Sequence, residues 1–254
     1  MESELLIKMT EGTSNQQLIL FPYLGGSRSS FQTLIMELGD SYQVWVANPP
    51  GHIGSNSPLV EDMNQLVDMY YEALKKIVGE EYYLVGHSMG GNIAYFLAKK
   101  LCSSECELAR PMGIIITGSG SPKVMHGQNI SQWDEERLLH KVKSYGLLPP
   151  ELVNEDDILQ AFVPIFRADY KILETGSDIE IEEKLELPAY LIWGEKDTVE
   201  SIDLVVDWLR YFKNRLVVMP IKDGTHMFIN SHAKEVSEYI AKITKGCYDQ
   251  EEDE

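Results

Sequence analysis

The segment Gly86-His87-Ser88-Met89-Gly90 places a serine between two glycines. An apolar run typical of a strand, 82–85, precedes this segment, and a run typical of a helix, 92–98, follows it. A serine on a tight strand-to-helix turn holds its hydroxyl clear of the backbone, and the flanking glycines allow the strand and the helix to approach closely. The pattern therefore predicts that Ser88 is a nucleophile.

A serine nucleophile needs a general base, and in this order of elements the base follows the last strand. The last strand-like run, 216–219, leads into a glycine-containing loop, 222–228, that holds His226. We therefore predict that His226 accepts the proton of Ser88. The remaining histidines are expected to be surface or packed residues: His52, His87, His126, His140 and His232.

The base in turn needs a carboxylate that orients its ring and stabilises its charged form. The strand-like run 113–117 is followed by no carboxylate, whereas the run 189–193 is followed by Gly194-Glu195-Lys196-Asp197. Asp197 is favoured because the turn places it beyond the end of the strand, and Glu195 is the reserve acid. Aspartate is also a preferred helix N-cap, and one side chain is not expected to serve both roles easily.

An acyl-transfer site also needs donors for the oxyanion that forms during attack. One donor is expected to be the backbone N–H of Met89, the residue after the nucleophile. The second is expected from the loop Pro22-Tyr23-Leu24-Gly25-Gly26, which follows the strand-like run 18–21. Within that loop the N–H of Leu24 or of Tyr23 could point at the oxyanion.

These segments together resemble the type II thioesterases, the free-standing editing hydrolases of nonribosomal peptide and polyketide synthesis, within the α/β-hydrolase superfamily. The same family includes the medium-chain thioesterase of animal fatty acid synthase. Two positions depart from its usual pattern: His52 stands where an arginine is common, and Thr225 where glycine or aspartate is common. The matching segments are Phe21–Gly26 with Ser30-Phe31, Gly86–Gly91, Leu148–Glu151, Phe166–Tyr170, Gly194–Asp197 and Gly224–Phe228.

The resemblance implies a thioester hydrolase that releases acyl groups from the phosphopantetheine arm of acyl or peptidyl carrier protein domains. It implies a Ser-His-Asp acyl-enzyme mechanism and no metal or diffusible cofactor. Two alternatives stay open. One is a general carboxylesterase or carbon–carbon bond hydrolase of the same fold, because a triad alone does not distinguish a thioester from an oxoester. The other is a catalytically inactive binding module.

Short apolar runs alternate with helix-period segments along the chain, which predicts a mostly parallel twisted sheet covered by helices on both faces. This agrees with an α/β-hydrolase fold in a single domain over residues 1–247. Residues from about 123 to 184 break the alternation and are expected to form a helical lid. Its expected helices are 134–144, 156–166 and 168–175, interrupted by Pro149-Pro150 and Pro164. Residues 248–254 are expected to be an acidic, disordered tail.

The chain has 254 residues, and 22 basic against 40 acidic residues give a formal net charge of −18. This charge opposes nucleic acid or an anionic membrane as a partner. No signal peptide and no membrane-spanning run is apparent, and three cysteines indicate reduced thiols. We therefore expect a cytoplasmic protein, and a monomer. Three basic residues that flank the lid could meet a carrier protein: Lys123, Lys141 and Lys143.

Overall fold

The computed structural model describes residues 5–146 and 156–248. A seven-stranded sheet in the order β1-β3-β2-β4-β5-β6-β7 runs through the middle of this part of the chain. Only the edge strand β1 is antiparallel to its neighbour, and the other five pairings are parallel. The predicted mostly parallel sheet is confirmed.

The strands are short and are separated by helices, as the alternation of the sequence indicates. The strands are β1 (Leu6–Lys8), β2 (Gln17–Phe21), β3 (Gln43–Ala47), β4 (Tyr82–His87), β5 (Gly113–Thr117), β6 (Ala189–Gly194) and β7 (Leu216–Ile221). The α-helices are α1 (Gln32–Leu38), α2 (Met63–Leu74), α3 (Met89–Leu101), α4 (Glu135–Ser144), α5 (Asp156–Asp178), α6 (Ile202–Val206), α7 (Phe228–Ser231) and α8 (Ala233–Thr244). The 3₁₀ turns are η1 (Pro122–Met125), η2 (Ile130–Gln132) and η3 (Asp207–Arg210).

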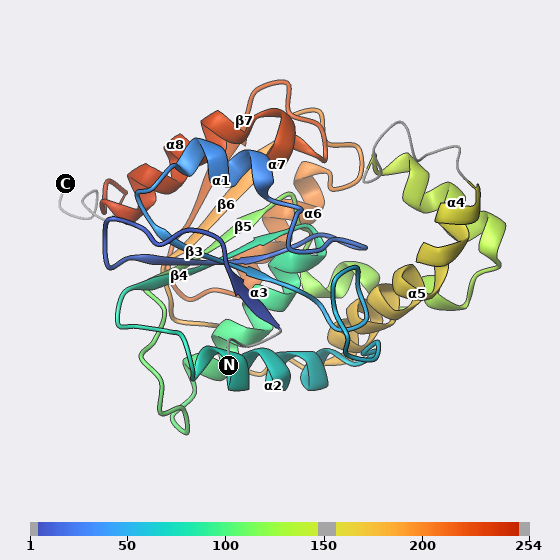
Figure 1. Ribbon diagram of the computed structural model, residues 1–254, viewed down its shortest axis with the longest axis horizontal. Coiled ribbons are helices and arrows are strands. Elements are labelled where there is room, and N and C mark those ends of the chain that lie inside the picture. Colours follow the sequence, from blue (N-terminus) through green and yellow to red (C-terminus); the bar gives the residue numbers. More distant parts are fainter. Residues whose placement is uncertain (1–4, 147–155, 249–254) are drawn as a thin grey trace.

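Helices cover both faces of the sheet. Helices α1, α7 and α8 lie on one face, and α2 and α3 lie on the other (Figure 1). Buried apolar side chains form two separate groups, one on each side of the sheet, between the sheet and the helices that cover it. Every residue of β2, β4 and β5 is buried, as expected for central parallel strands that are covered on both faces. Because these strands are parallel, their carboxyl ends meet along one edge of the sheet.

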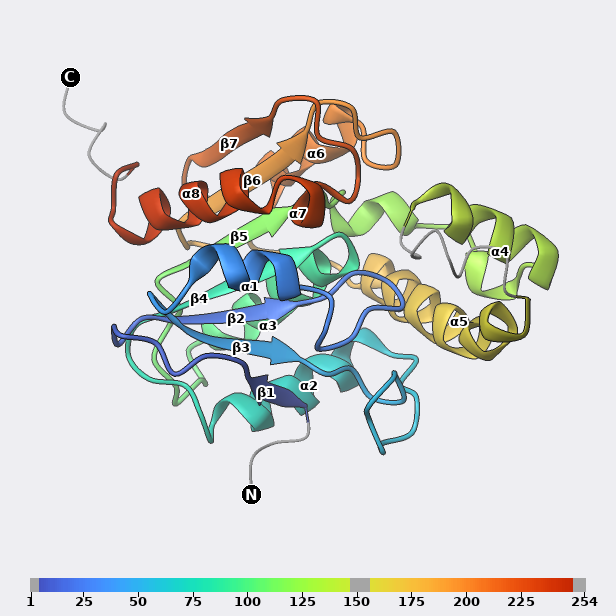
Figure 2. The same ribbon diagram turned by 45° about the horizontal axis from the view of Figure 1, so that its top comes forward.

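The insertion between β5 and β6 forms a helical lobe at that edge (Figure 2). The side chain of Arg167, on α5, donates to the carbonyl oxygens of Ser131 and Trp133, both at 2.7 Å. The carboxylate of Glu174, also on α5, accepts from the amide and the hydroxyl of Ser131. These bonds fasten the start of the lobe to α5.

The lobe differs from its prediction in one respect, because 156–166 and 168–175 are a single helix. Pro164 lies inside α5, where its ring removes one backbone hydrogen bond. The helix nevertheless continues, and the side chains of Leu159 and Phe166, which lie on either side of the proline, are both buried. Packing therefore outweighs the local effect of the proline.

Two sequence predictions fall on residues outside the described ranges. The segment Leu148–Glu151 and residues 249–254 of the predicted tail are among them. Tyr248, the first residue of that predicted tail, is described, and the centre of its ring lies 6.2 Å from that of Tyr190 on β6. Within the described ranges no helix is both long and apolar enough to cross a membrane.

Candidate active site

Ser88 lies at the turn between β4 and α3, with φ 53° and ψ −122°. A positive φ is uncommon for a residue with a side chain, and it costs free energy that the surrounding structure must supply. The amide of Ser88 donates to the carbonyl of Thr117 on β5 (2.9 Å). A Cβ on Gly86 would lie 2.1 Å from the carbonyl oxygen of Gly90, and therefore no other residue type fits there. The close strand-to-helix turn that the glycines predict is present.

His226 lies in the loop after β7 and reaches Ser88. Its Nε2 is 3.0 Å from the Ser88 hydroxyl oxygen, and its Nδ1 is 2.9 Å from Oδ2 of Asp197. His226 is 3% exposed and Asp197 is 6% exposed. The structure thus joins in one hydrogen-bonded chain the three side chains that the sequence singled out.

Asp197 also serves the turn that follows β6. Its second oxygen, Oδ1, accepts from the backbone amides of Val199 (2.8 Å) and Glu200 (3.0 Å). The expectation that one side chain would not easily hold both the histidine and a capping position was therefore wrong, because each role uses a different oxygen. The residue does not cap α6, whose N-cap is Ser201.

The reserve acid Glu195 is exposed on the same turn and makes no hydrogen bond with its side chain to another described residue. Asp223, the other carboxylate near the histidine in sequence, forms an exposed ion pair with Lys196 (2.6 Å). Its φ of 60° shows that it shapes the turn after β7. Asp197 alone of these carboxylates contacts His226.

A second histidine packs directly behind the first. His87 is fully buried, its Nδ1 lies 2.9 Å from the hydroxyl of Thr117, and its ring centre is 5.5 Å from that of His226. Burial lowers the pKa of His87 well below its usual range, and the charge on His226 lowers it further. A neutral His87 adds no positive charge beside His226.

Two of the residues whose amides were predicted as oxyanion donors, Leu24 and Met89, line the same cavity as Ser88. Met89 is the first residue of α3, where a helix leaves its amide without an internal partner. Within the described residues the amides of Tyr23, Leu24 and Met89 donate to no other group. All three stay candidates for the oxyanion donors.

The loop that carries Tyr23 and Leu24 is held by a carboxylate that sequence reasoning did not assign. Asp169, on α5, accepts a hydrogen bond from the amide of Gly25 at 2.6 Å and is 1% exposed. Burial raises the pKa of Asp169 to about 7, and the Gly25 amide opposes this rise. The available signal was a carboxylate on the same helical face as Phe166 and Tyr170, both buried. Its partner, however, is 144 residues away in the sequence.

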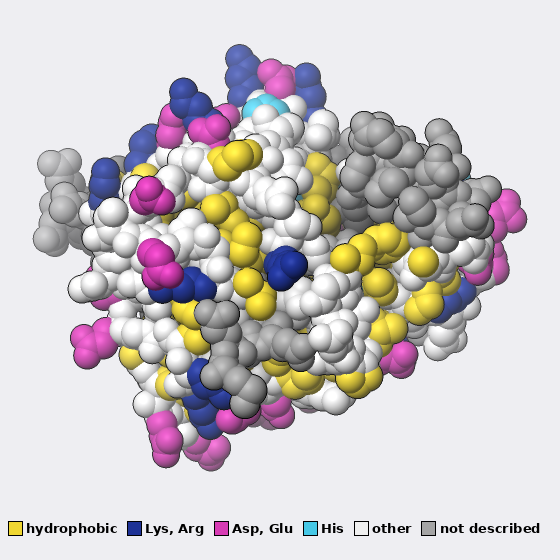
Figure 3. Space-filling model, viewed as in Figure 1, with side chains coloured by type: hydrophobic (Ala, Val, Ile, Leu, Met, Phe, Trp, Pro, Cys, Tyr) yellow, Lys and Arg dark blue, Asp and Glu magenta, His cyan; other side chains and the backbone are white. Residues whose placement is uncertain are grey.

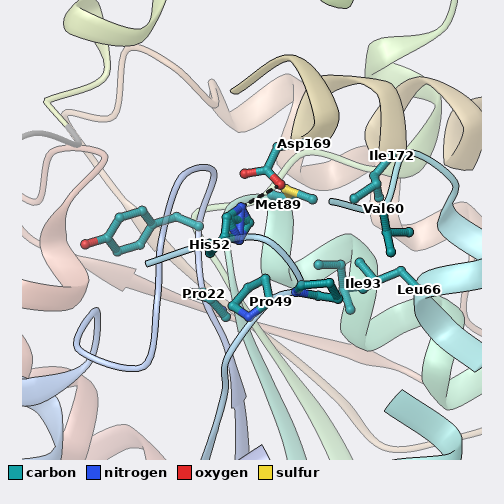
Figure 4. A pocket seen from close by; sticks show the side chains of 11 residues that line it. Pro22, Pro49, His52, Val60, Leu66, Met89, Ile93, Asp169 and Ile172 are labelled. Carbon is teal, nitrogen blue, oxygen red and sulfur yellow. Dashed lines mark ion pairs between the residues drawn. The ribbon is translucent and has the colours of Figure 1, made fainter. Parts of the chain in front are cut away.

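Asp169 also lies beside His52, with Met89 alongside (Figure 4). The His52 Nε2 is 3.2 Å from Asp169 Oδ1, yet neither ring nitrogen of His52 makes a well-aligned hydrogen bond. Burial lowers the pKa of His52 to about 4, so the imidazole is neutral at neutral pH. The prediction of a packed histidine agrees with this position, and the contact is not that of a charged pair.

A cavity opens at Ser88, between the body of the protein and the lobe. The lobe contributes apolar and aromatic walls, and the ring centre of Tyr145 lies 5.8 Å from that of His226. The body contributes Leu24, Met89, Asn92 and polar residues of the loop after β5. No cluster of three or more metal-ligating side chains occurs among residues 5–146 and 156–248. The site is therefore a serine with a proton acceptor, free amide donors and a partly apolar cavity.

Comparison with known proteins finds thioesterases that match nearly the whole chain. The sequence model of the thioesterase domain family matches residues 16–244. The chain is 26% identical over 235 residues to the probable anguibactin biosynthesis thioesterase AngT of Vibrio anguillarum, covering 89% of this chain and 90% of that protein. It is 25% identical to the medium-chain S-acyl fatty acid synthase thioesterase of Rattus norvegicus, covering 89% of this chain and 87% of that one.

Solved structures show the same fold. The type II thioesterase BorB from the borrelidin biosynthetic cluster superposes with a TM-score of 0.83 at 19% identity, covering 96% of this chain and 99% of that one. The family match, which spans residues 16–244, carries the assignment beyond the fold. The chain belongs to the thioesterase domain family, and it is a thioester hydrolase of the α/β-hydrolase fold.

Proposed function

We propose that the protein hydrolyses acyl thioesters carried on the phosphopantetheine arm of acyl or peptidyl carrier proteins, in nonribosomal peptide, polyketide or fatty acid synthesis. The observation that carries this proposal is the hydrogen-bonded chain Ser88–His226–Asp197 at the mouth of a cavity walled by the lobe. The names of the matched proteins, which include an anguibactin biosynthesis thioesterase and a fatty acid synthase thioesterase, support the substrate class.

The first half of the reaction transfers the acyl group to the enzyme. Ser88 Oγ attacks the carbonyl carbon while its proton passes to His226 Nε2, 3.0 Å away. Asp197 holds the ring by its Nδ1 and stabilises the imidazolium. When the carbon–sulfur bond breaks, the sulfur leaves as a thiolate that takes up the proton from His226, and an ester on Ser88 remains.

The second half releases the acid. His226 accepts a proton from water, whose oxygen attacks the ester carbon. The proton then returns to Ser88 as the carbon–oxygen bond to Ser88 breaks. In both halves the oxyanion accepts hydrogen bonds from the amide of Met89 and from that of Leu24 or Tyr23. This sequence of steps uses only side chains and amides of the chain together with water.

Asp169 is the positioning residue for this oxyanion loop. Its bond to the Gly25 amide fixes the backbone next to Leu24, and its place on α5 ties that loop to the lobe. Electrostatic stabilisation depends on donors that are already in position when the charge develops. The lobe therefore contributes to the chemistry through this contact as well as through the walls of the cavity.

Carrier proteins are commonly acidic, and this chain is acidic too, so its overall field does not attract a carrier of that kind. On the face drawn in Figure 3 the basic side chains are scattered among acidic ones. Of the lysines expected near the carrier, Lys123 donates to the carbonyls of Ser177 (2.7 Å) and Ile179 (3.5 Å), so it fastens the end of α5. Lys141 and Lys143, in the last turn of α4, remain as candidate docking residues.

The triad is tested by single substitutions. Ser88→Ala and His226→Ala are each expected to lower kcat on the order of 10⁴-fold or more, and the double variant little further, because the two residues act as a unit. Asp197→Asn is expected to lower kcat strongly, because the amide holds the histidine in the wrong tautomer. Steady-state hydrolysis of a small acyl thioester measures these losses. Glu195→Gln is the matched control on the same turn; a collapse there with Asp197→Asn near wild type would refute the acid assignment.

Asp169 is tested by the split between binding and chemistry. Asp169→Ala is expected to lower kcat about 10- to 100-fold with little change in KM, since misplacing one oxyanion donor weakens transition-state stabilisation more than substrate binding. Asp169→Asn keeps an oxygen that can accept from Gly25 and is expected to lose less. Lys171→Ala, on the same helix, is the control. A change confined to KM, or equal loss in the alanine and asparagine variants, would count against this role.

The substrate class is tested with a matched pair of acyl compounds. The purified protein is expected to hydrolyse a short acyl group loaded on a holo carrier protein at least 10-fold more efficiently, in kcat/KM, than the same acyl group on a small oxoester. The tethered arm supplies binding energy that the oxoester lacks. Release of free acid is measured by mass spectrometry. Preference for the oxoester would support the carboxylesterase alternative, and no turnover of either compound would support an inactive module.

A further inference from the structure

The described lining of the cavity at Ser88 contains one acidic side chain and no basic one. This described lining includes the polar residues Asn92, Ser119 and Ser121 and several apolar ones, but Glu200 is the only acidic or basic residue among them. Asn92 already donates to the Ser119 hydroxyl and to the carbonyl of Gly120, both at 3.1 Å. The hydroxyl of Ser121 donates to Asp207 at 2.6 Å. These polar groups have partners within the protein.

Glu200 has an unused oxygen. Its Oε2 is shielded from solvent and makes no hydrogen bond to any described residue. The backbone of Glu200 is held on both sides, because its amide donates to Asp197 and its carbonyl accepts from the indole N–H of Trp193 (3.1 Å). Gly120 faces the carboxylate, and a Cβ there would come within 2.4 Å of Oε2. The glycine thus leaves the space that the carboxylate occupies.

The surroundings of Glu200 favour its protonated form in the free protein. Burial raises the pKa of Glu200 to about 8, and the charge of Asp197 raises it further, whereas Lys141 and the Gly120 amide oppose the rise. Lys141 lies over the ring of Tyr145, 5.3 Å from its centre, and forms no ion pair with Glu200 within the described residues. The hydroxyls of Tyr145 and Tyr170 pair with each other at 3.2 Å. No basic side chain among the described residues therefore forms an ion pair with Glu200.

Ionised Glu200 costs free energy because it is half-buried without a cation beside it, and a cationic donor that arrives with a ligand lowers that cost. A donor with a positive charge lowers it more than a neutral one does, because charge-assisted bonds are the stronger ones. A second carboxylate on the acyl group would lose hydration in the cavity and would meet no basic side chain in its described lining. The cavity therefore distinguishes acyl groups by the charge that they carry near the thioester.

We propose that Glu200 selects acyl groups that carry a protonated amine, such as aminoacyl thioesters, over neutral acyl groups of the same shape and over acyl groups that carry a second carboxylate. The inference rests on the proposed thioesterase function and names its substrate class. In the complex the ammonium donates to the carboxylate of Glu200 while the thioester carbonyl lies at Ser88. No covalent step beyond those already described is involved.

The test compares acyl groups of matched chain length that differ in the charge of their terminal group, each carried on the same small thiol. Glycyl, propionyl and malonyl thioesters form one series, and β-alanyl, butyryl and succinyl thioesters form the other. With wild-type protein, kcat/KM corrected for the uncatalysed rate is expected to be at least about 10-fold higher for the aminoacyl member than for the neutral one, the scale of a charged hydrogen bond. The member with the second carboxylate is expected to be the slowest.

Variants then assign the effect to the side chain. Glu200→Gln is expected to reduce the aminoacyl-to-neutral ratio to within about threefold of one. Glu195→Gln removes the same charge from an exposed position on the neighbouring turn, and its ratio is expected to match wild type. Circular dichroism and thermal unfolding show whether each variant is folded. If Glu200→Gln does not fold, the rates of the wild-type protein on the two series test the inference.

Equal rates for the aminoacyl and neutral members with wild-type protein would overturn the inference while leaving the thioesterase function intact. An aminoacyl preference that persists unchanged in folded Glu200→Gln would also overturn it, because another group would then be responsible. If no thioester of either series is hydrolysed, the proposed function itself fails, and the inference fails with it.

Discussion

The close approach of α3 to the ends of β2 and β4 is the constraint on which the rest of the site depends. A Cβ on Gly90 would lie 2.0 Å from the carbonyl oxygen of Phe21, so the helix can begin there only with glycine. That contact holds Ser88 at a positive φ above the sheet edge. It also brings the loop after β2, with the amides of Tyr23 and Leu24, beside the first residue of α3. One backbone contact thus positions both the nucleophile and the expected oxyanion donors.

Around this point the chain places two buried carboxylates, Asp197 and Asp169, and one half-buried carboxylate, Glu200, in different states. Asp197 is fully used, with one oxygen on His226 and the other on two amides. Asp169 holds the Gly25 amide and links the lobe to the oxyanion loop. Glu200 keeps one oxygen without a partner in the described structure. The neutral His87 completes the arrangement, because burial of a charged ring behind His226 would oppose proton uptake there. The hydrogen-bond partners of each carboxylate, more than its residue type, indicate whether it orients the histidine, positions the oxyanion loop or binds the acyl group.

The sequence was sufficient for the parts of the site that depend on local pattern and chain order. Ser88 follows from its strand–glycine–helix context, and His226 and Asp197 follow from their places after β7 and β6. The two roles of Asp197 were not predictable, because they depend on how the turn to Glu200 closes. The role of Asp169 was not predicted, because its partner Gly25 is distant in the sequence and comes near only in the folded protein. Pro164 misled the helix assignment because the packing of α5 decides its length, whereas the pattern shows only the local cost of the proline.

The central claim is that the acyl group passes through Ser88. Reaction of the protein with a fluorophosphonate, followed by peptide mapping with mass spectrometry, tests this claim most directly. The account predicts one adduct per chain, on Ser88, whose formation slows when an acyl thioester is present. An adduct on another serine, or thioester hydrolysis that continues undiminished when Ser88 carries the adduct, would contradict the account.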